Sequence, residues 1–347
     1  MHVFYSDRHR AHRGRYEFFR GELVPCFETP ERADIVLAAT RSQGIGPVLE
    51  PAPFDLARIE RVHAPRYVRF LEQAWTRWNA LGHTKDALPA VWPIRGMRHD
   101  IEPDDFIAQL GLYSFDSGTP FTTGTWIAAR TGADIALTAA RHVATGQGHS
   151  AFALTRPPGH HAGADFMGGY CFLNNAAIAA QALLDGGAQR IALLDVDYHH
   201  GNGTQAIFYR RADVLFLSIH GDPKTEYPFY LGHADERGAG PGAGFNVNYP
   251  LPAGCDNSRW FDALEDASKR IAEYRADALV VSLGVDTFAG DPISKFKLEA
   301  PEFRRLGERL ARLALPTVFV LEGGYAVSEI GDNVAHVLGS FDGAAPA

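Results

Sequence analysis

The feature that most limits what this chain can fold into is a series of five short apolar runs without polar alternation. They are rich in leucine and β-branched residues, and they cover 151–155, 191–195, 214–219, 278–283 and 317–321. Uninterrupted runs of this length are typical of strands that are buried on both faces of a parallel sheet. We therefore predict that the runs form the centre of such a sheet.

Segments with helical spacing of apolar residues lie before or between these runs. They cover 125–144, 174–184, 260–276 and 301–315, and the last begins with a proline in its first turn. Strands that alternate with helices favour an open α/β sheet with right-handed crossovers. We predict about eight mostly parallel strands with helices on both faces. The chain has no linker of low complexity, so a single domain over 1–347 is expected.

The segment 81–123 differs from the rest of the chain. It contains several prolines and a run of mixed charge, together with the aromatic residues Trp92, Phe106, Tyr113 and Phe115. A long segment without clear periodicity inside a compact domain is usually functional or disordered. The aromatic content favours an ordered insertion that packs on a substrate, on a partner subunit or on the domain surface.

Charge and composition exclude several classes of protein. Lys and Arg total 33 against 41 Asp and Glu, for a net charge of -8, so a nucleic-acid-binding protein with a basic face is not expected. Cys26, Cys171 and Cys255 are isolated, which argues against a disulfide framework. The start lacks the apolar core of a signal peptide, and no apolar run is long enough to span a membrane. These features predict a cytoplasmic protein that does not bind membranes.

Polar residues follow each of the five apolar runs. After the runs come His160-His161, Asp197-Tyr198-His199-His200, His220, Asp286 and Glu322-Gly323-Gly324-Tyr325. The carboxyl ends of parallel strands lie at one edge of a sheet, where sites are usually built. The alternative is a set of unrelated polar loops. The shared edge favours one functional site.

Asp197 and His199 are two residues apart, so both side chains point to the same side of an extended segment. An oxygen and a nitrogen ligand suit a borderline divalent cation such as zinc. With Asp286 as a third ligand, positions would stay open for water and substrate, which is typical of a catalytic zinc site. The competing interpretation is a polar loop whose histidines only satisfy local hydrogen bonds.

Other polar groups at this edge fit a hydrolytic reaction. His160 and His161 are adjacent imidazoles suited to general acid–base catalysis. Tyr325 follows two glycines, and its hydroxyl can donate to a developing oxyanion. Asp195 and Asn202 are candidates for orienting the histidines.

These motifs together resemble the arginase/deacetylase superfamily and, within it, the zinc-dependent histone deacetylase family. The resemblance rests on five stretches in the expected order, at 156–161, 168–175, 195–203, 282–286 and 322–325. The stretches at 220–223, 286–288 and 291–294 are similar to the bacterial acetylpolyamine amidohydrolase branch. The resemblance implies the arginase/deacetylase fold.

The resemblance also implies roles for individual residues. Asp197, His199 and Asp286 would bind one catalytic Zn²⁺, with His161 as the general base and acid, His160 as its partner and Tyr325 as the transition-state donor. Tyr170 and Tyr227 would line a substrate channel, and Ile293 would lie near its mouth. Two structural K⁺ sites are implied, one at Asp195, Asp197, His199, Ser218 and Ile219, and one at Phe208, Arg211, Val214 and Phe245.

In polyamine-type members of the family, an insertion at the position of 81–123 packs across a homodimer and narrows the channel. A narrow channel would admit a thin acetylated amine, whose distal ammonium would bind a carboxylate. Glu17, Glu102 and Asp116 are the candidates. The family pattern has two glutamates near Ile107 and Gly118, and this chain has no acid at either position.

The sequence therefore predicts a zinc-dependent amidohydrolase that removes acetyl groups from N-acetylated polyamines or other small acetylated amines. Three alternatives stay open at this point. One is a protein or peptide lysine deacetylase, or a broad acylamide hydrolase. Another is an arginase-like ureohydrolase with two manganese ions, for which the extra ligands are not evident. The last is a sensor that keeps the pocket without catalysis.

Overall fold

A computed structural model of the protein describes residues 1–344, and its main feature is one parallel sheet. The strands lie in the order β4-β1-β5-β10-β9-β6-β7-β8, and all neighbours are parallel. They are β1 (His2–Phe4), β4 (Val48–Leu49), β5 (Ser150–Ala153), β6 (Ile191–Asp195), β7 (Val214–Gly221), β8 (Asn246–Leu251), β9 (Ala278–Leu283) and β10 (Thr317–Leu321). The predicted α/β sheet is confirmed.

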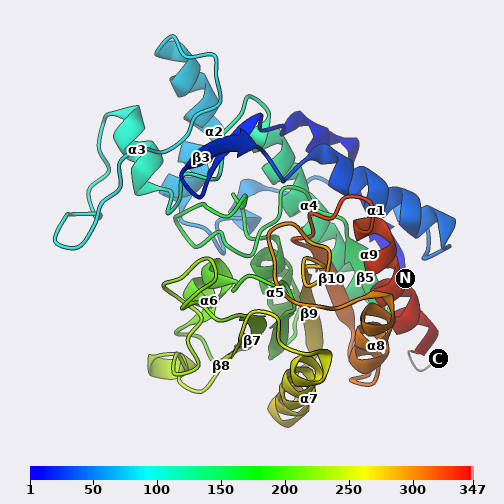
Figure 1. Ribbon diagram of the computed structural model, residues 1–347. Helices are drawn as coiled ribbons and strands as arrows, with labels where there is room; N and C mark the ends of the chain where they lie inside the picture. Colours follow the sequence, from blue (N-terminus) through cyan, green and yellow to red (C-terminus); the bar gives the residue numbers. More distant parts are fainter. Residues whose placement is uncertain (345–347) are drawn as a thin grey trace.

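Helices cover both faces of the sheet (Figure 1). The long helices are α1 (Pro30–Ser42), α2 (Pro65–Ala80), α4 (Thr125–Ala144), α5 (Asn175–Asp185), α7 (Asn257–Tyr274), α8 (Ala300–Ala311) and α9 (Ile330–Ala344), and the short ones are α3 (Phe106–Leu112) and α6 (Asn202–Phe208). Short 3-10 helices lie at Asp7–Ala11, Leu56–Arg58 and Gly240–Gly242. Outside the main sheet, β2 (Tyr16–Phe19) and β3 (Glu22–Pro25) form an antiparallel hairpin.

The core is divided by the sheet into two apolar layers. In β5, Phe152 packs with α1, α8 and α9, whereas Ala151 and Ala153 face α2, α4 and α5 on the other side. Side chains of successive strand residues point to opposite faces, so both faces of the central strands have to be apolar. This two-sided burial explains why the five runs of the sequence lack alternation.

Most differences from the sequence prediction lie at the ends of helices. The helix expected at 260–276 begins earlier, because Asp256 caps it by accepting from the backbone N–H of Arg259, and it ends before Arg275, which has a left-handed φ of 55°. The helix expected at 301–315 ends at Ala311. Asn174 caps α5, so that helix starts one residue after its predicted position.

The segment 81–123 is partly ordered by the body of the protein. Its base is closed by a bridge between Ala87 and Phe121. Within it, α3 buries Phe106 and Leu110 against α2 and its neighbours. The stretch before α3 projects from the molecule, at the left of Figure 1 in cyan. The insertion is therefore a folded helix with a protruding loop.

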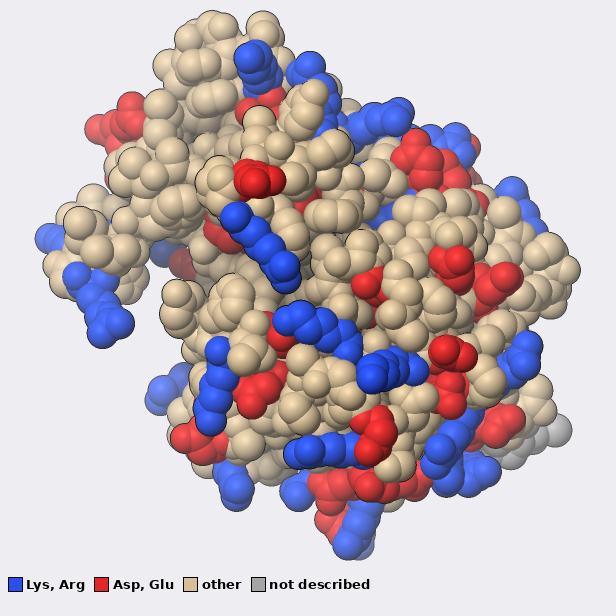
Figure 2. Space-filling view, viewed as in Figure 1, with Lys and Arg blue, Asp and Glu red and all other residues tan. Residues whose placement is uncertain are grey.

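The surface of the protein carries mixed charge. Figure 2 shows acidic and basic side chains interspersed over the face that it presents, without a broad basic area. Among the described residues, no helix is both long and apolar enough to cross a membrane. A single domain over 1–347 stays our prediction, and its last three residues lie outside the described part.

Candidate active site

Three buried side chains meet where two neighbouring strands end. Asp197 and His199 follow β6, and Asp286 follows β9, which pairs with β6 in register. One ligand atom from each of the three lies within 4.8 Å of the others. Asp197 and Asp286 are fully buried, and His199 is 8% exposed. The predicted ligand set is therefore brought together at the carboxyl edge of the sheet.

The negative charge of the two carboxylates in this group would be balanced by a divalent cation. His199 Nδ1 lies 3.0 Å from Asp286 Oδ2 and 3.4 Å from Asp197 Oδ1. Burial, and then the charge of Asp197, raise the pKa of Asp286 to about 8. Two buried carboxylates this close are costly unless a positive charge lies between them. Two carboxylate oxygens and one imidazole nitrogen, with one side left open, match the ligands of a catalytic zinc.

Backbone amides fix the orientation of both carboxylates. Asp197 accepts from the N–H groups of His199 at 2.9 Å and Gly323 at 2.8 Å, and Asp286 accepts from Tyr198 N–H at 2.8 Å. A Cβ atom at Gly323 would lie 2.5 Å from an oxygen of each carboxylate. Only glycine fits there, which explains part of the Glu-Gly-Gly-Tyr motif.

The two adjacent histidines have different partners. His160 Nδ1 lies 2.9 Å from Asp195 Oδ2, and His161 Nδ1 lies 2.6 Å from Asn202 Oδ1. Burial lowers the pKa of His160, but Asp197 and then Asp195 outweigh it and raise that pKa to about 10. Burial, followed by the charge of His160, holds the pKa of His161 well below 6.5. The neighbouring carboxylates therefore favour the protonated form of His160, whereas burial favours the neutral form of His161.

Tyr325 is held at the pocket by the loop that follows β10. Its backbone N–H donates to Asp291 Oδ2 at 2.7 Å. The guanidinium of Arg32 lies 4.6 Å from the centre of its ring and donates to the carbonyls of Glu322 and Gly324, each at 2.6 Å. Burial raises the pKa of the Tyr325 hydroxyl well above 10. The hydroxyl is therefore a proton donor at every physiological pH.

A buried ion network supports this loop, and the sequence analysis missed it. Glu28 accepts from Arg156 Nε at 2.7 Å and Nη2 at 2.8 Å, and from Arg32 Nη1 at 2.9 Å. All three side chains are at most 2% exposed. Arg156 belongs to the Arg-Pro-Pro-Gly-His-His motif, but its partner lies 128 residues away. No local pattern predicts a contact of that separation.

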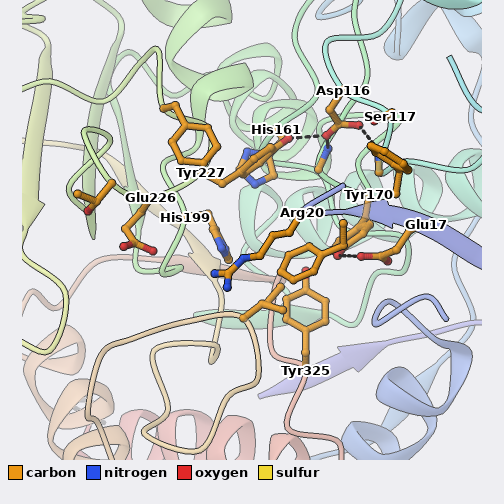
Figure 3. A pocket seen from close by; sticks show the side chains of 17 residues that line it. Glu17, Arg20, Asp116, Ser117, His161, Tyr170, His199, Glu226, Tyr227 and Tyr325 are labelled. Atoms are coloured by element: carbon orange, nitrogen blue, oxygen red, sulfur yellow. Dashed lines mark hydrogen bonds between the residues drawn. The ribbon is translucent and has the colours of Figure 1, made fainter. Parts of the chain in front are cut away.

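A pocket of about 330 Å³ leads from the surface to these groups (Figure 3). His161, His199 and Tyr325 are among its lining residues, together with the predicted channel residues Tyr170, Tyr227 and Ile293. The ring of Tyr227 lies edge-on to that of His161, with ring centres 5.2 Å apart. The reactive groups that line the pocket are therefore reached through a channel whose wall includes several aromatic rings.

Of the three predicted substrate-binding acids, the structure places two in the pocket. Glu17 and Asp116 line it, whereas Glu102 is exposed on the projecting segment and is not among the lining residues. Glu17 accepts from the Tyr170 hydroxyl at 2.7 Å, and Asp116 accepts from the Tyr227 hydroxyl at 2.6 Å. Both acids therefore hold a channel tyrosine in place.

The pocket also contains residues that the sequence analysis did not select. They include Arg20, Phe229 and Glu226. Arg20 lies at the turn of the β2–β3 hairpin, and Glu226 lies in the loop after β7. A short exposed hairpin gives little sequence signal, and the placement of its turn beside the pocket depends on tertiary contacts.

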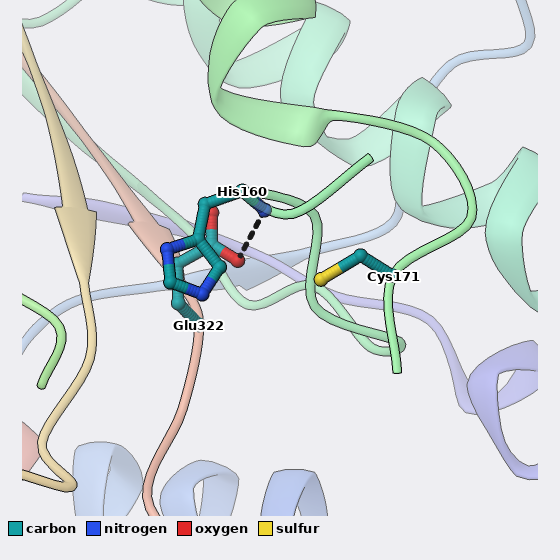
Figure 4. A group of neighbouring side chains, drawn as sticks. All are labelled: His160, Cys171 and Glu322. Carbon is teal, nitrogen blue, oxygen red and sulfur yellow. Dashed lines mark hydrogen bonds between the residues drawn. The ribbon is translucent and has the colours of Figure 1, made fainter. Parts of the chain in front are cut away.

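A second group of potential ligands is drawn in Figure 4. His160, Cys171 and Glu322 also have ligand atoms within 4.8 Å of one another. However, Glu322 Oε2 already accepts from the N–H groups of Gly159 at 2.6 Å and His160 at 3.1 Å. Burial raises the pKa of the Cys171 thiol well above 9. This group therefore fits a hydrogen-bonded support for the His160 loop better than a metal site.

The residues of the two implied potassium sites lie in two separate places. Asp195 and Ser218 are register partners on β6 and β7, next to Asp197, His199 and Ile219. The second set surrounds the turn from α6 to β7, where Arg211 N–H donates to the Phe208 carbonyl and Phe216 N–H donates to the Phe245 carbonyl. Val214 begins β7. Both potassium sites stay predictions.

Comparisons with known proteins agree with the motifs. The model of the histone deacetylase domain matches residues 26–341. The chain is 57% identical to acetylpolyamine amidohydrolase 2 of Pseudomonas aeruginosa over 343 residues, which covers 99% of each chain. It is 49% identical to the acetylpolyamine amidohydrolase of Mycoplana ramosa over 338 residues, which covers 97% of this chain and 98% of that one. A crystal structure of acetylpolyamine aminohydrolase from Burkholderia pseudomallei superposes with a TM-score of 0.94 at 40% identity, covering 100% of both chains. The resemblance inferred from the sequence is confirmed.

Proposed function

Because the chain belongs to the histone deacetylase family, we propose that it is a zinc-dependent amidohydrolase that deacetylates N-acetylated polyamines or other small acetylated amines. The products are acetate and the free amine. The single observation that carries the proposal is the convergence of a three-ligand set, a histidine pair and a tyrosine hydroxyl around one deep pocket. Metal-assisted amide hydrolysis uses such a metal site, a general base and an oxyanion donor.

Asp197, His199 and Asp286 would hold the metal. A divalent cation there supplies Lewis acidity, which polarises the amide carbonyl and makes a water acidic enough to attack at neutral pH. Two carboxylates and one imidazole suit Zn²⁺. We also expect the two potassium sites described above to support the loops after β6 and β7.

The side chains of the protein provide the proton transfers. His161 is the group that accepts a proton from the attacking water, since its imidazole is neutral and lines the pocket. Asn202 accepts from its Nδ1–H and thereby leaves Nε2 free to take the proton. The proton then passes to the leaving amine. Tyr325 donates a hydrogen bond to the carbonyl oxygen as negative charge develops on it.

The form of the channel supports a thin substrate. Tyr170 and Tyr227 line it, and Phe115, which is not itself a lining residue, stacks on Tyr227 with ring centres 5.9 Å apart. Asp116, in the same segment as Phe115, ties the 81–123 insertion to both Tyr227 and Gly169. An acetylated alkyl amine fits such a channel with few specific contacts.

The direct test is an acetate-release assay with the zinc-loaded protein. The substrates are acetylputrescine, acetylcadaverine and acetylspermidine beside an acetyl-lysine peptide, each with and without a chelator. We expect chelator-sensitive release that is faster from the small amines than from the peptide. A preference for the peptide would favour the lysine deacetylase alternative, and no release from any substrate would contradict the proposal.

We also propose that the protein forms a homodimer through the 81–123 segment. Val91, Ile94 and Met97 in this segment are 64%, 67% and 58% exposed, which is unusual for neighbouring apolar side chains. Sedimentation of the wild type should report a dimer, and the double variant Ile94→Glu/Met97→Glu should be monomeric. Ile127→Glu, at an exposed apolar position on α4, is the control. A monomeric wild type would contradict the dimer.

A further inference from the structure

Glu226 is a nearly buried carboxylate in the wall of the pocket. It lies in the loop after β7, directly before the channel residue Tyr227, and is 6% exposed. Figure 3 shows it at the pocket near Tyr227 and His199. An ionised carboxylate with so little contact with water is costly unless a cation lies against it. This part of the channel wall therefore needs a positive charge.

In the free protein the positive charge comes from Lys295. Its Nζ lies 2.6 Å from Glu226 Oε1, and it is the one cation that pairs with Glu226 among residues 1–344. The Lys295 side chain is 45% exposed and is not among the residues that line the pocket. It reaches Glu226 from the loop after β9, two residues beyond the lining residue Ile293. A lysine ammonium on its flexible stem can turn into water, so this partner can be exchanged.

Two other acids line the pocket, and their hydrogen bonds hold its walls. Asp116 accepts from the Tyr227 hydroxyl. Glu17 accepts from the Tyr170 hydroxyl. Withdrawing either carboxylate would release a channel tyrosine. Glu226 pairs instead with a side chain outside the pocket, so its partner is the one that an entering ammonium can replace without disturbing the channel tyrosines.

We propose that Glu226 binds the distal ammonium of the substrate and that Lys295 is an internal competitor, whose ammonium leaves Glu226 when the substrate binds. This inference rests on the proposed function and assigns the residue that selects for a cationic end. The favoured class is the N-acetylated diamines. Such a substrate ends in an ammonium on an alkyl chain, which is the group that Lys295 already presents to this carboxylate. The exchange breaks one ion pair, forms another and changes no covalent bond.

Two substitutions distinguish this competition from a purely structural role. If the pair only held the loops after β7 and β9 together, removing either partner would change substrate binding in the same direction. In a competition the two changes have opposite signs. Glu226→Gln removes the binding group, whereas Lys295→Met removes its competitor and leaves the carboxylate in place.

A pair of matched amides reports on the charge alone. N-acetylcadaverine and N-hexylacetamide have the same number of non-hydrogen atoms, and they end in an ammonium and a methyl group respectively. kcat/KM is measured for both with the wild type, Glu226→Gln, Lys295→Met and the control Lys297→Met. Lys297 is exposed in the same loop and does not line the pocket, so it controls for the loss of one positive charge nearby.

We expect Glu226→Gln to lower the ratio of the cationic to the neutral kcat/KM about tenfold, as loss of a hydrogen bond between charged groups would. Lys295→Met should raise that ratio about threefold. Lys297→Met should leave it within about twofold of the wild type. The proposal is overturned if Lys295→Met does not raise the ratio beyond that of Lys297→Met, or if folded Glu226→Gln does not lower it. Because Lys295→Met keeps the carboxylate, it decides the outcome even if Glu226→Gln does not fold.

Binding measurements separate this proposal from the proposed function. Calorimetric titration of both amides into the same variants gives their Kd values whether or not acetate is released. Absence of turnover would contradict the deacetylase function alone. The role of Glu226 would be supported by a Kd preference for N-acetylcadaverine that falls in Glu226→Gln and rises in Lys295→Met. Any other pattern, including no binding of N-acetylcadaverine to the wild type, would overturn that role.

Discussion

The hydroxyl of Tyr227 donates a hydrogen bond of 2.6 Å to Asp116, 111 residues earlier in the chain. Asp116 belongs to the insertion between α2 and α4, and Tyr227 belongs to the loop that follows β7. The same carboxylate accepts from the backbone of Gly169, next to Tyr170. One side chain of the insertion therefore fixes two walls of the channel.

Asp116→Asn should widen the channel without touching the reactive groups. Charge-assisted hydrogen bonds are worth about 1.5–3 kcal/mol, so we expect kcat/KM for acetylcadaverine to fall about tenfold, mostly through KM. Asp100→Asn, which removes an exposed acid of the same segment, is the control. If both variants kept wild-type kinetics, Asp116 would have no role in shaping the channel.

Tyr325→Phe removes the hydroxyl at the pocket and keeps the contact of the aromatic ring with the Arg32 guanidinium. Loss of one donor to an oxyanion typically costs 10²- to 10³-fold in kcat. We expect a loss of about this size with KM within about threefold, measured by steady-state acetate release. Tyr230→Phe, at an exposed position, should be neutral. Equal losses in turnover and in substrate affinity would argue for a binding role instead.

Glu28→Gln should destabilise the fold. It removes the negative charge that two buried guanidinium groups share, and breaking a buried ion pair costs about 3–5 kcal/mol. Urea unfolding should show this loss. Glu31→Gln, in the first turn of α1 and paired with Arg13 in solvent, should change stability by less than about 1 kcal/mol. Similar losses in the two variants would contradict the importance of the network.

Glu17 should make stability depend on pH. Burial, partly offset by the Tyr170 hydroxyl, raises its pKa from 4.5 to about 7. Between these values the unfolded chain ionises Glu17 while the folded protein keeps it protonated, so the folded state loses relative stability as pH rises through this window. Above about pH 7 the loss is constant.

The matching measurement compares urea unfolding of wild type and Glu17→Gln at pH 5 and pH 8. Relative to Glu17→Gln, the wild type should lose up to about 3 kcal/mol in free energy of unfolding between pH 5 and pH 8. Glu72→Gln, on the exposed side of α2, should show no such shift. A difference that is the same at both pH values would show that Glu17 ionises normally.

Much of the fold could be predicted because its central strands are buried on both faces. The runs at 191–195, 278–283 and 317–321 match β6, β9 and β10 in their bounds. The outer strands β4, β1 and β8 could not be found, because β4 has two residues, β1 has three, and the pattern of β8 is interrupted by partly exposed positions. Strands this short are specified by their neighbours.

The same distinction applies to the site. Asp197, His199 and Asp286 follow strand ends, and the topology of a parallel sheet is enough to bring strand ends together. Asp291 and Glu28 act through contacts that depend on where loops come to lie. Their residue types alone carry no such information.

The central claim is that Asp197, His199 and Asp286 hold the metal on which hydrolysis depends. The most direct test is the zinc content of dialysed wild type and Asp286→Asn, measured beside acetate release from acetylcadaverine in the same samples. The account predicts one zinc per chain in the wild type, and a variant that loses both zinc and activity while its circular dichroism spectrum is unchanged. Full activity in a zinc-free variant, or in wild type stripped of all metal, would contradict it.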